Sequence, residues 1–357
     1  GHVQASKAIV LGLQVLKPEL QIETIDYVRW INSTLEYITR LFYVKVTSKV
    51  PGIWHLLYDV TDRPFFAKYG LIRRLGFNRL YSYISFNKPK IIISTHFLTS
   101  AVVGEMKRRG YINVPLVTII TDNVLHAFWL NPHVDLYLVA NEKIKEDLIK
   151  HGISKSSIKV TGIPIDLNFT HQRGKNMLRI KNGLAPELPT ILVMSGAYGM
   201  GDIFGICEYL ASCELDLQVI IVTGKDKKLR NRIMDLAMDS KNKFTILGYV
   251  TNVFDWMGLA DLLVSKAGGL TTSEALASNL PMLIYRPIPG QEVGNADYLV
   301  KAGVARIANN MDQFTNEFES ILGNPEVLAK MTEKCSIVKK PFAALKGSEL
   351  LLQIVNF

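Results

Sequence analysis

Short runs of apolar, β-branched residues alternate with helical stretches along most of the chain, and this alternation limits the fold more than any other feature. Parallel strands need a long crossover between them, and a helix is the usual crossover. The pattern therefore predicts βαβ units on mostly parallel sheets. The predicted strands cover residues 90–95, 114–120, 135–140 and 158–160 in the first half, and 190–195, 217–222, 243–248, 261–264 and 281–285 in the second.

The length of 357 residues exceeds one ordinary hydrophobic core and suits two domains. A polar, turn-rich segment from Gly162 to Gly174 lacks a clear period, which is typical of a linker. We therefore expect an α/β fold of two Rossmann-like domains, residues 1–165 and 176–340, with parallel sheets that face a cleft. Residues 341–357 are expected to form a helix that crosses back to the first domain.

Composition excludes several classes of protein. With 48% apolar and 20% charged residues the chain is globular rather than disordered. Three cysteines without metal-ligand spacing predict neither a disulfide framework nor a zinc site, which favours a reducing compartment. No apolar run reaches the roughly 18–20 residues of a transmembrane helix, and the opening residues do not resemble a signal peptide. We expect a cytoplasmic protein.

The net charge of +9 is carried entirely by the first half of the chain. Residues 40–90 alone contain ten Lys or Arg, two Asp and eleven aromatic residues. Basic side chains attract anionic lipid headgroups and aromatic rings settle at the interface, so this stretch predicts docking on an anionic membrane and no nucleic-acid partner. RNA binding by stacking, or burial of the rings in a core, are the alternatives. The predicted membrane contacts are Trp54, Phe65, Phe66, Arg73, Arg74 and Arg79.

A first glycine loop, Ser195 to Gly201, follows the predicted strand 190–195 and precedes a helix. Glycines allow close approach of a phosphate, and the free N–H groups of a helix start stabilise an anion. A tight packing turn is an equal alternative for this spacing. A nicotinamide dinucleotide site is disfavoured, because the strand ending at Val222 is followed by no acidic residue.

A second glycine loop lies between Ser265 and Val300 and carries more polar side chains. Gly268 and Gly269 open space at the carboxyl end of a predicted strand. Glu274 is placed to accept hydrogen bonds from ribose hydroxyls, although Thr271 and Glu274 also fit a capping box. Side chains after a rigid turn are suited to reading sugar hydroxyls, and a solvated loop is the alternative. These side chains are Gln291, Glu292 and Asn295.

These motifs resemble a known family. The segment GGLTTSEAL…NLPMLIY…PIPGQEVGNADYL resembles the donor-site motif of glycosyltransferase family 28, which has the two-domain GT-B fold. In the first half, TDNVLHAFWLNPHVDLYLVANEKIKEDLIKHGI…IKVTGIPID resembles the branch that glycosylates diacylglycerol, the bacterial processive glucosyltransferases and the monogalactosyldiacylglycerol synthases. Gly1-His2-x-x-Ala5 matches the glycine–histidine motif of the family. The resemblance covers nearly the whole chain.

The resemblance implies roles in the second domain. Ser195, Gly196 and Gly199 would face the donor diphosphate, with Gly268 and Gly269 beside them. Tyr249 and Val250 would receive the uracil ring, and Glu274 the ribose. Lys266 stands where some relatives carry a basic residue near the donor, with an ordinary strand-end lysine as the alternative. The residues that would read the sugar are Gln291, Glu292 and Asn295.

In the first domain the resemblance implies that His2 is the general base. Asp122 and His126 would orient the base or the glycerol, His96 is similarly placed, and Trp129 would contact glycerol or lipid. A packed structural cluster is the alternative. Relatives carry a strand before the glycine–histidine pair, and this chain has none, so the predicted first domain lacks its first strand. Either the sequence is part of a longer chain or His2 is weakly held.

The resemblance therefore implies inverting transfer of glucose or galactose from a UDP-sugar to diacylglycerol, on the cytoplasmic face of the membrane. No metal ion or other cofactor is expected, because the family lacks a D-x-D motif and the chain has none. A related activity is N-acetylglucosaminyl transfer to a polyprenyl-diphosphate muramyl lipid. A member of another class, a non-catalytic membrane- or nucleic-acid-binding protein, would keep the same fold.

Overall fold

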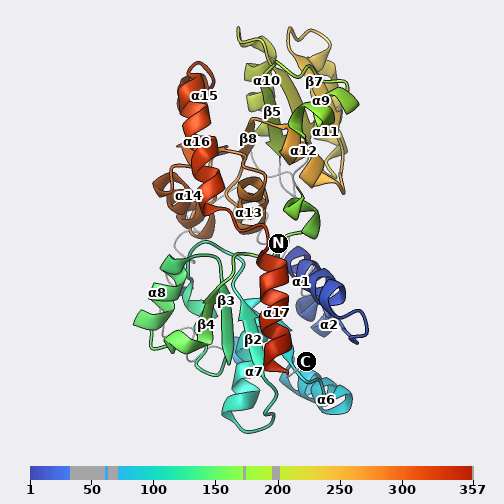
Figure 1. The fold of residues 1–357 in the computed structure, drawn as a ribbon, viewed down its shortest axis with the longest axis vertical. Coiled ribbons are helices and arrows are strands. Elements are labelled where there is room, and N and C mark those ends of the chain that lie inside the picture. Colours follow the sequence, from blue (N-terminus) through green and yellow to red (C-terminus); the bar gives the residue numbers. More distant parts are fainter. Residues whose placement is uncertain (33–60, 63–70, 172–173, 195–201, 356–357) are drawn as a thin grey trace. The chain divides into compact units, whose positions relative to one another are not determined.

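Contacts within the chain divide it into two compact units. The computed structural model describes residues 1–32, 61–62, 71–171, 174–194 and 202–355. Unit 1 consists of Gly1–Leu167 and Lys340–Phe357, and unit 2 of Asn168–Lys339 (Figure 1). The predicted domains, 1–165 and 176–340, differ from these divisions by two residues at 165, eight at 176 and one at 340.

Unit 1 is built on a parallel sheet of four described strands in the order β1-β2-β3-β4. The two central strands are buried along their whole length, which accounts for their unbroken apolar sequences. Each lies one or two residues inside its predicted range. The elements are α1 (His2–Leu16), α2 (Tyr27–Ile31), η1 (Leu71–Arg74), α6 (Phe77–Asn87), β1 (Ile92–Ser94), α7 (Phe97–Arg108), β2 (Leu116–Ile119), η2 (Ala127–Trp129), β3 (Leu136–Val139), α8 (Glu142–Lys150), η3 (Lys155–Ser157), β4 (Ile158–Val160) and α17 (Ala343–Ile354).

Helices α1 and α17 cover one face of the unit 1 sheet and lie side by side, although they are separated by more than 300 residues of sequence (Figure 1). Ile9 and Leu13 from α1 and Leu351 from α17 pack on Val117 and Leu138 of the sheet. Helices α7 and α8 contact the strands as well. The expected return of the C-terminal helix to the first domain is therefore present within unit 1.

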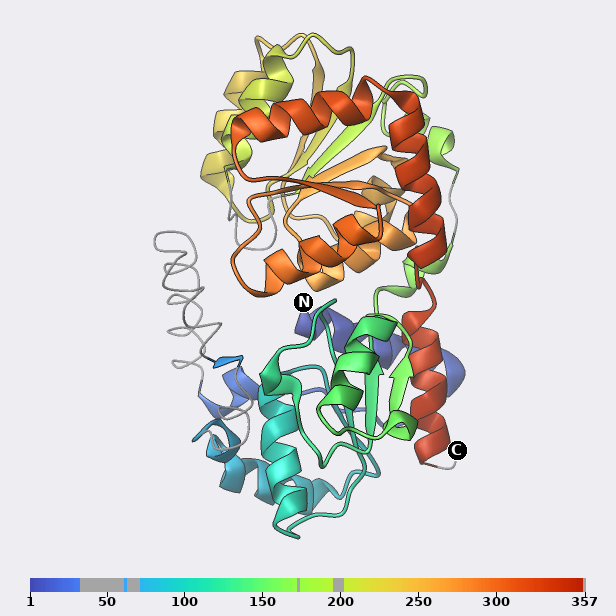
Figure 2. The same cartoon turned by 90° about the vertical axis from the view of Figure 1, so that its left-hand side faces the viewer.

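Unit 2 is built on a parallel sheet of six described strands in the order β10-β9-β8-β5-β6-β7. Figure 2 shows α15 and α16, in orange-red, in front of this sheet, where Phe314 and Phe318 of α15 pack on Tyr285 of β9 and on α10. The elements are η4 (Leu167–Thr170), α9 (Lys175–Lys181), β5 (Thr190–Met194), α10 (Ile203–Ser212), β6 (Gln218–Val222), α11 (Lys227–Ala237), β7 (Lys243–Leu247), α12 (Val253–Leu259), β8 (Leu262–Ser265), α13 (Gly269–Ala277), β9 (Met282–Tyr285), α14 (Gln291–Lys301), β10 (Ala305–Ala308), α15 (Met311–Leu322) and α16 (Pro325–Val338).

Parts of the fold differ from the sequence expectation. Helix α1 and strand β10 have no counterpart among the expected elements, and β10 lies at a sheet edge. The helix expected over residues 341–357 begins only at Ala343, and it is separated from α16 because Pro341 has no N–H and disfavours helix before it. The segment taken as a linker begins with buried residues Gly162 to Ile165, so the division falls a few residues later.

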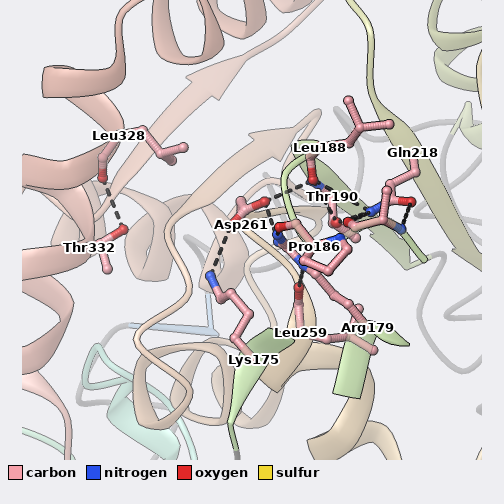
Figure 3. A network of polar contacts seen from close by, with 11 residues as sticks. Lys175, Arg179, Pro186, Leu188, Thr190, Gln218, Leu259, Asp261, Leu328 and Thr332 are labelled. Carbon is pink, nitrogen blue, oxygen red and sulfur yellow. Dashed lines mark hydrogen bonds and ion pairs between the residues drawn. The ribbon is translucent and has the colours of Figure 1, made fainter. Parts of the chain in front are cut away.

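A buried ion pair fixes α9 to the sheet of unit 2 (Figure 3). Asp261 accepts hydrogen bonds from the backbone N–H of Thr190, from Lys175 Nζ at 2.9 Å and from Arg179 Nη2. Arg179, only 4% exposed, also donates to the carbonyls of Pro186 and Leu259. The charged groups are paired and hydrogen-bonded, as buried charges must be. The network joins α9 to the start of β5 and to the residue before β8.

Candidate functional site

Polar side chains of unit 1 gather where its strands end. Thr95 and His96 follow β1, and Thr121 and Asp122 follow β2. Because the strands are parallel, these residues lie at the same edge of the sheet, the edge where α/β proteins bind ligands. The first residue of α1, His2, lies at this edge as well, since it contacts the ends of both strands.

The His2 side chain is held by the ends of two strands. Its Nδ1 lies 2.7 Å from the carbonyl oxygen of Thr95 and 2.9 Å from Thr121 Oγ1. The Thr95 hydroxyl donates to the His2 carbonyl at 3.1 Å. The ring meets that of His96 edge to face at 4.7 Å. The expectation that His2 is weakly held without a preceding strand is therefore wrong.

Both imidazoles are neutral at physiological pH. Burial lowers the pKa of His2 to about 4, although the hydrogen bond with Thr95 acts in the opposite direction. Burial also lowers the pKa of His96 to about 3, with the neighbouring His2 adding to the effect. A neutral imidazole has a lone pair with which to accept a proton, as a general base must.

The third imidazole, His126, begins the short helix η2. Its Nδ1 accepts the N–H of Phe128 at 3.1 Å. Asp62 Oδ1 accepts the N–H of Ala127 at 2.7 Å and lies 3.8 Å from His126 Nε2. Asp122 is buried at the end of β2. Asp62 could not be selected from local sequence patterns, because 65 residues separate it from Ala127.

A buried tyrosine supports the loop that carries His126. The hydroxyl of Tyr137, on β3, contacts the carbonyls of Trp129 and Asn131 and accepts the N–H of Asn131. Trp129 is 3% exposed and meets Phe97 at an angle of 82°. Its ring thus belongs to the packing beneath the edge, as in the packed-cluster alternative, rather than to an exposed lipid contact.

In unit 2 the strand order identifies a ligand-binding position. The chain runs from β5 to β6 and β7, then returns to the other side of β5 with β8, β9 and β10. At this reversal, between β5 and β8, the segments that follow the two strands leave on opposite faces of the sheet. Open parallel sheets bind their ligands at such a position, beyond the carboxyl ends of the strands. Ser265 Oγ at the end of β8 donates to the Met194 carbonyl at the end of β5. Ser195, Gly196 and Gly199 lie outside the described residues.

Helix α13 starts at this position, and its N-cap residue, Gly268, has no side chain to cap the first N–H groups. Its φ is −69°, and a Cβ there would meet none of the described residues within 4 Å. The described packing therefore does not demand this glycine, and a glycine at a helix N-terminus allows close approach of an anion. The capping-box alternative is wrong, because Thr271 and Glu274 both lie inside the helix.

The helix after the first glycine loop is different. Helix α10 is capped by Asp202, whose Oδ1 accepts the N–H of Gly205 at 3.1 Å. A carboxylate therefore already occupies the N-terminus that the sequence pattern suggested for a phosphate, and α13 offers the better anion site of the two.

Helix α14 brings the expected sugar-reading residues to the end of β9. Gln291 is exposed, and Glu292 Oε2 accepts the N–H of Ile288 at 2.9 Å. Burial raises the pKa of Glu292 and lowers that of Lys266, and each charge opposes the shift of the other. Asn295 is 1% exposed, and its amide donates to the carbonyl of Ala267. Asn295 thus braces the loop of Gly268.

The remaining expected residues are placed as follows. Tyr249 follows β7 and is 63% exposed, with Val250 partly buried beside it. Arg73 lies against Glu105 with its side chain 15% exposed, so it faces the protein rather than solvent. Arg79 is exposed but stacks over Trp30, and Arg74 is exposed. Trp54, Phe65 and Phe66 lie outside the described residues.

The described part of the chain contains neither a cluster of metal ligands nor a membrane-spanning helix. Within those residues no group of three or more His, Cys, Asp or Glu is arranged to hold a metal ion. None of the described helices is long and apolar enough to cross a membrane.

Two protein-family models match the chain. The model described as "Monogalactosyldiacylglycerol (MGDG) synthase" matches residues 2–165, and that described as "Glycosyltransferase family 28 C-terminal domain" matches residues 190–344. Among curated proteins, the processive diacylglycerol β-glucosyltransferase of Bacillus licheniformis is 31% identical over 93% of this chain and 86% of its own length. The enzymes of that name from Bacillus subtilis and Staphylococcus aureus are 30% and 31% identical over 99% and 100% of this chain, and 91% and 90% of their own lengths.

Solved structures show the same fold at lower identity. MurG of Acinetobacter baumannii is similar with a TM-score of 0.59 at 16% identity, over 79% of this chain and 78% of its own. MnaA of S. aureus, solved with UDP, is similar with a TM-score of 0.60 at 14% identity, over 80% and 81%. These likenesses, with the two parallel sheets, identify the GT-B type of fold. The chain therefore belongs to glycosyltransferase family 28, in the branch of the diacylglycerol glucosyltransferases and monogalactosyldiacylglycerol synthases.

Proposed function

We propose that the protein transfers glucose from UDP-glucose to the free hydroxyl of 1,2-diacylglycerol, with inversion at the anomeric carbon. The names of the relatives, which match 93% or more of the chain, support the diacylglycerol acceptor and favour glucose over galactose. The glucose of UDP-glucose is α-linked, so a β-product requires inversion. For the N-acetylglucosaminyl alternative the comparisons offer only the likeness of fold to MurG, at 16% identity.

The observation that carries the proposal is the held, neutral imidazole of His2 at the carboxyl edge of the unit 1 sheet. In the proposed reaction the diacylglycerol oxygen bonds to the anomeric carbon while its proton moves to His2 Nε2. The bond between the anomeric carbon and the β-phosphate oxygen breaks, and UDP leaves with the electron pair. Asp62 and His126 would lie beside the glycerol.

Unit 2 would bind the donor. The first backbone N–H groups of α13, which follow Gly268, would stabilise the negative charge of the leaving diphosphate without a metal ion. Glu274 would hold the ribose, Gln291 and Glu292 the glucose hydroxyls, and Tyr249 with Val250 the uracil. Asn295 would keep the Gly268 loop in place.

We further propose that the protein acts at the cytoplasmic face of the membrane, where diacylglycerol and UDP-glucose meet. The positive charge of residues 40–90 supports attraction to anionic lipid. A non-catalytic protein of the same fold would bind vesicles or RNA and form no product.

The test incubates the full chain with diacylglycerol vesicles and UDP-glucose, UDP-galactose or UDP-N-acetylglucosamine, in EDTA. We expect glucosyl-diacylglycerol as the main product. His2→Ala should lower turnover about 10²- to 10⁴-fold, the usual contribution of a general base, and leave UDP affinity unchanged. The control is His151→Ala, an exposed histidine at the end of α8, which should keep full turnover. Absence of glycolipid with all three donors would refute the proposal.

A further inference from the structure

The three imidazoles at the unit 1 edge use their Nδ1 atoms in two different ways. In His96 and His126 this atom accepts a backbone N–H, from Leu98 at 3.2 Å and from Phe128 at 3.1 Å. In His2 the same atom lies 2.7 Å from the carbonyl oxygen of Thr95. A carbonyl oxygen accepts hydrogen bonds and never donates them.

These contacts fix the position of the proton on each neutral ring. A neutral imidazole carries one N–H and one lone pair, and the partner of one nitrogen decides the state of the other. Because His96 and His126 accept at Nδ1, they carry their proton on Nε2 and present an N–H donor. His2 must donate from Nδ1, so its Nε2 presents a lone pair. Of these three rings, His2 is the one able to take a proton at Nε2.

Thr121 completes the support of the His2 ring. Its Oγ1 lies 2.9 Å from Nδ1, within reach of the same N–H that donates to the Thr95 carbonyl. The two acceptors come from the ends of neighbouring strands, β1 and β2, which are paired through Ser94 and Thr118. The Nδ1–H is thereby shared between two fixed points, and the ring plane is set as well as the tautomer.

We propose that Thr121 is a positioning residue: together with the Thr95 carbonyl it fixes the plane of the His2 ring, whose Nε2 accepts the proton of the acceptor hydroxyl. This assignment rests on the proposed function and deepens it. His96 and His126 serve instead as hydrogen-bond donors at the same edge.

Kinetics of the full chain test the role with matched variants. Thr121→Val removes the hydroxyl at nearly constant volume, and we expect kcat to fall about 10- to 100-fold, the usual cost of losing a group that orients a functional histidine. Thr121→Ser should restore most of the lost kcat. Both variants should keep the wild-type KM for UDP-glucose. The control is Thr118→Val. It removes a buried hydroxyl from β2, the strand that precedes Thr121, and this hydroxyl contacts Ser100. An equal loss of kcat in the control would overturn the proposal.

The tautomer has a readout that does not need turnover. Nitrogen NMR of the protein labelled with ¹⁵N in histidine distinguishes a protonated ring nitrogen from one with a lone pair, and His2→Asn assigns the His2 signals. At pH 7 we expect a protonated Nδ1 and a lone pair on Nε2 in the wild type, and the same tautomer in Thr121→Val, because the Thr95 carbonyl remains. A protonated Nε2 in the wild type would overturn this inference even if glycolipid forms. Absence of glycolipid with the expected NMR signals would refute the proposed function and leave the tautomer assignment supported.

Discussion

Thr95 supports His2 through two separate atoms, and this double contact holds the side chain of a partly buried histidine at the start of a helix. The carbonyl of Thr95 binds the ring, and its hydroxyl binds the backbone of the same residue. Burial then removes the ring from water, which disfavours the charged form and lowers the pKa. The two effects together keep His2 neutral and in one orientation.

The low pKa values of His2 and His96 predict that unit 1 loses stability in mild acid. Between pH about 6.5, where an unfolded histidine titrates, and pH about 4, the unfolded chain binds more protons at these two positions than the folded one. The free energy of unfolding should therefore fall as the pH drops through this window. Denaturant unfolding at a series of pH values measures it.

The control for this prediction is the double variant His2→Asn and His96→Asn. Asparagine at position 96 keeps a side-chain oxygen able to cap α7 in place of the imidazole. The variant should show a smaller loss of stability between pH 6.5 and 4 than the wild type. An unchanged pH dependence would contradict the assignment of the effect to these two rings. Among the described residues of unit 1, burial also lowers the pKa of His133, which both the variant and the wild type retain.

Sequence reasoning found part of this site. His96, Asp122 and His126 were predictable because each follows a strand, and parallel strands end at one edge. Thr95, Thr121 and Asp62 were not, because a threonine after a strand is common and the contact of Asp62 with Ala127 joins distant segments. The resemblance to the family supplied His2, whereas only the structure could show which of its nitrogens is protonated.

Among the helices, a tight contact joins the first and the last of the described chain. A Cβ on Gly12 of α1 would lie 2.5 Å from Ser348 Oγ and 3.0 Å from the carbonyl oxygen of Ala344 on α17. Ser348 donates to the carbonyl of Ile9, so the two helices also share a hydrogen bond. Small residues at this crossing let α17 hold the helix that carries His2.

Gly12→Val should separate these helices. Overpacking of a tight contact costs about 1–3 kcal/mol, and we expect a loss of that size in the free energy of unfolding of unit 1. Chemical denaturation measures it. The control is Gln14→Val, which places the same β-branched residue on the exposed side of α1. Equal destabilisation by both variants would contradict the role of the contact with α17, because valine has a higher helix propensity than glycine.

Element boundaries show where local pattern failed. Thr271 and Glu274 have the spacing of a capping box, yet the N-cap is Gly268, three residues before Thr271, because only two residues separate it from the end of β8. The strands were predicted well since buried parallel strands have continuous apolar sequences. Strand β10 lies at the sheet edge and exposes Arg306, which interrupts this apolar signal.

At the scale of the whole molecule, α17 makes unit 1 discontinuous in sequence. We predict that deletion of residues 340–357 removes the cover of α1 and destabilises unit 1, while unit 2 keeps its own unfolding transition. Unit 2 should also keep its affinity for UDP, because the residues proposed to bind the donor lie within 168–339. Calorimetry of unfolding and of UDP binding in the truncated and full chains measures both. Loss of UDP binding on truncation would contradict the independence of unit 2.

The return of α17 also sets an order of assembly during synthesis. Domains fold as their residues leave the ribosome, and all of unit 2 emerges before α17 does. The proposed donor-binding unit can thus be complete while the helix that carries His2 still lacks its partner. A nascent chain would thus complete the unit proposed to bind nucleotide before α17 covers α1, which carries the proposed base.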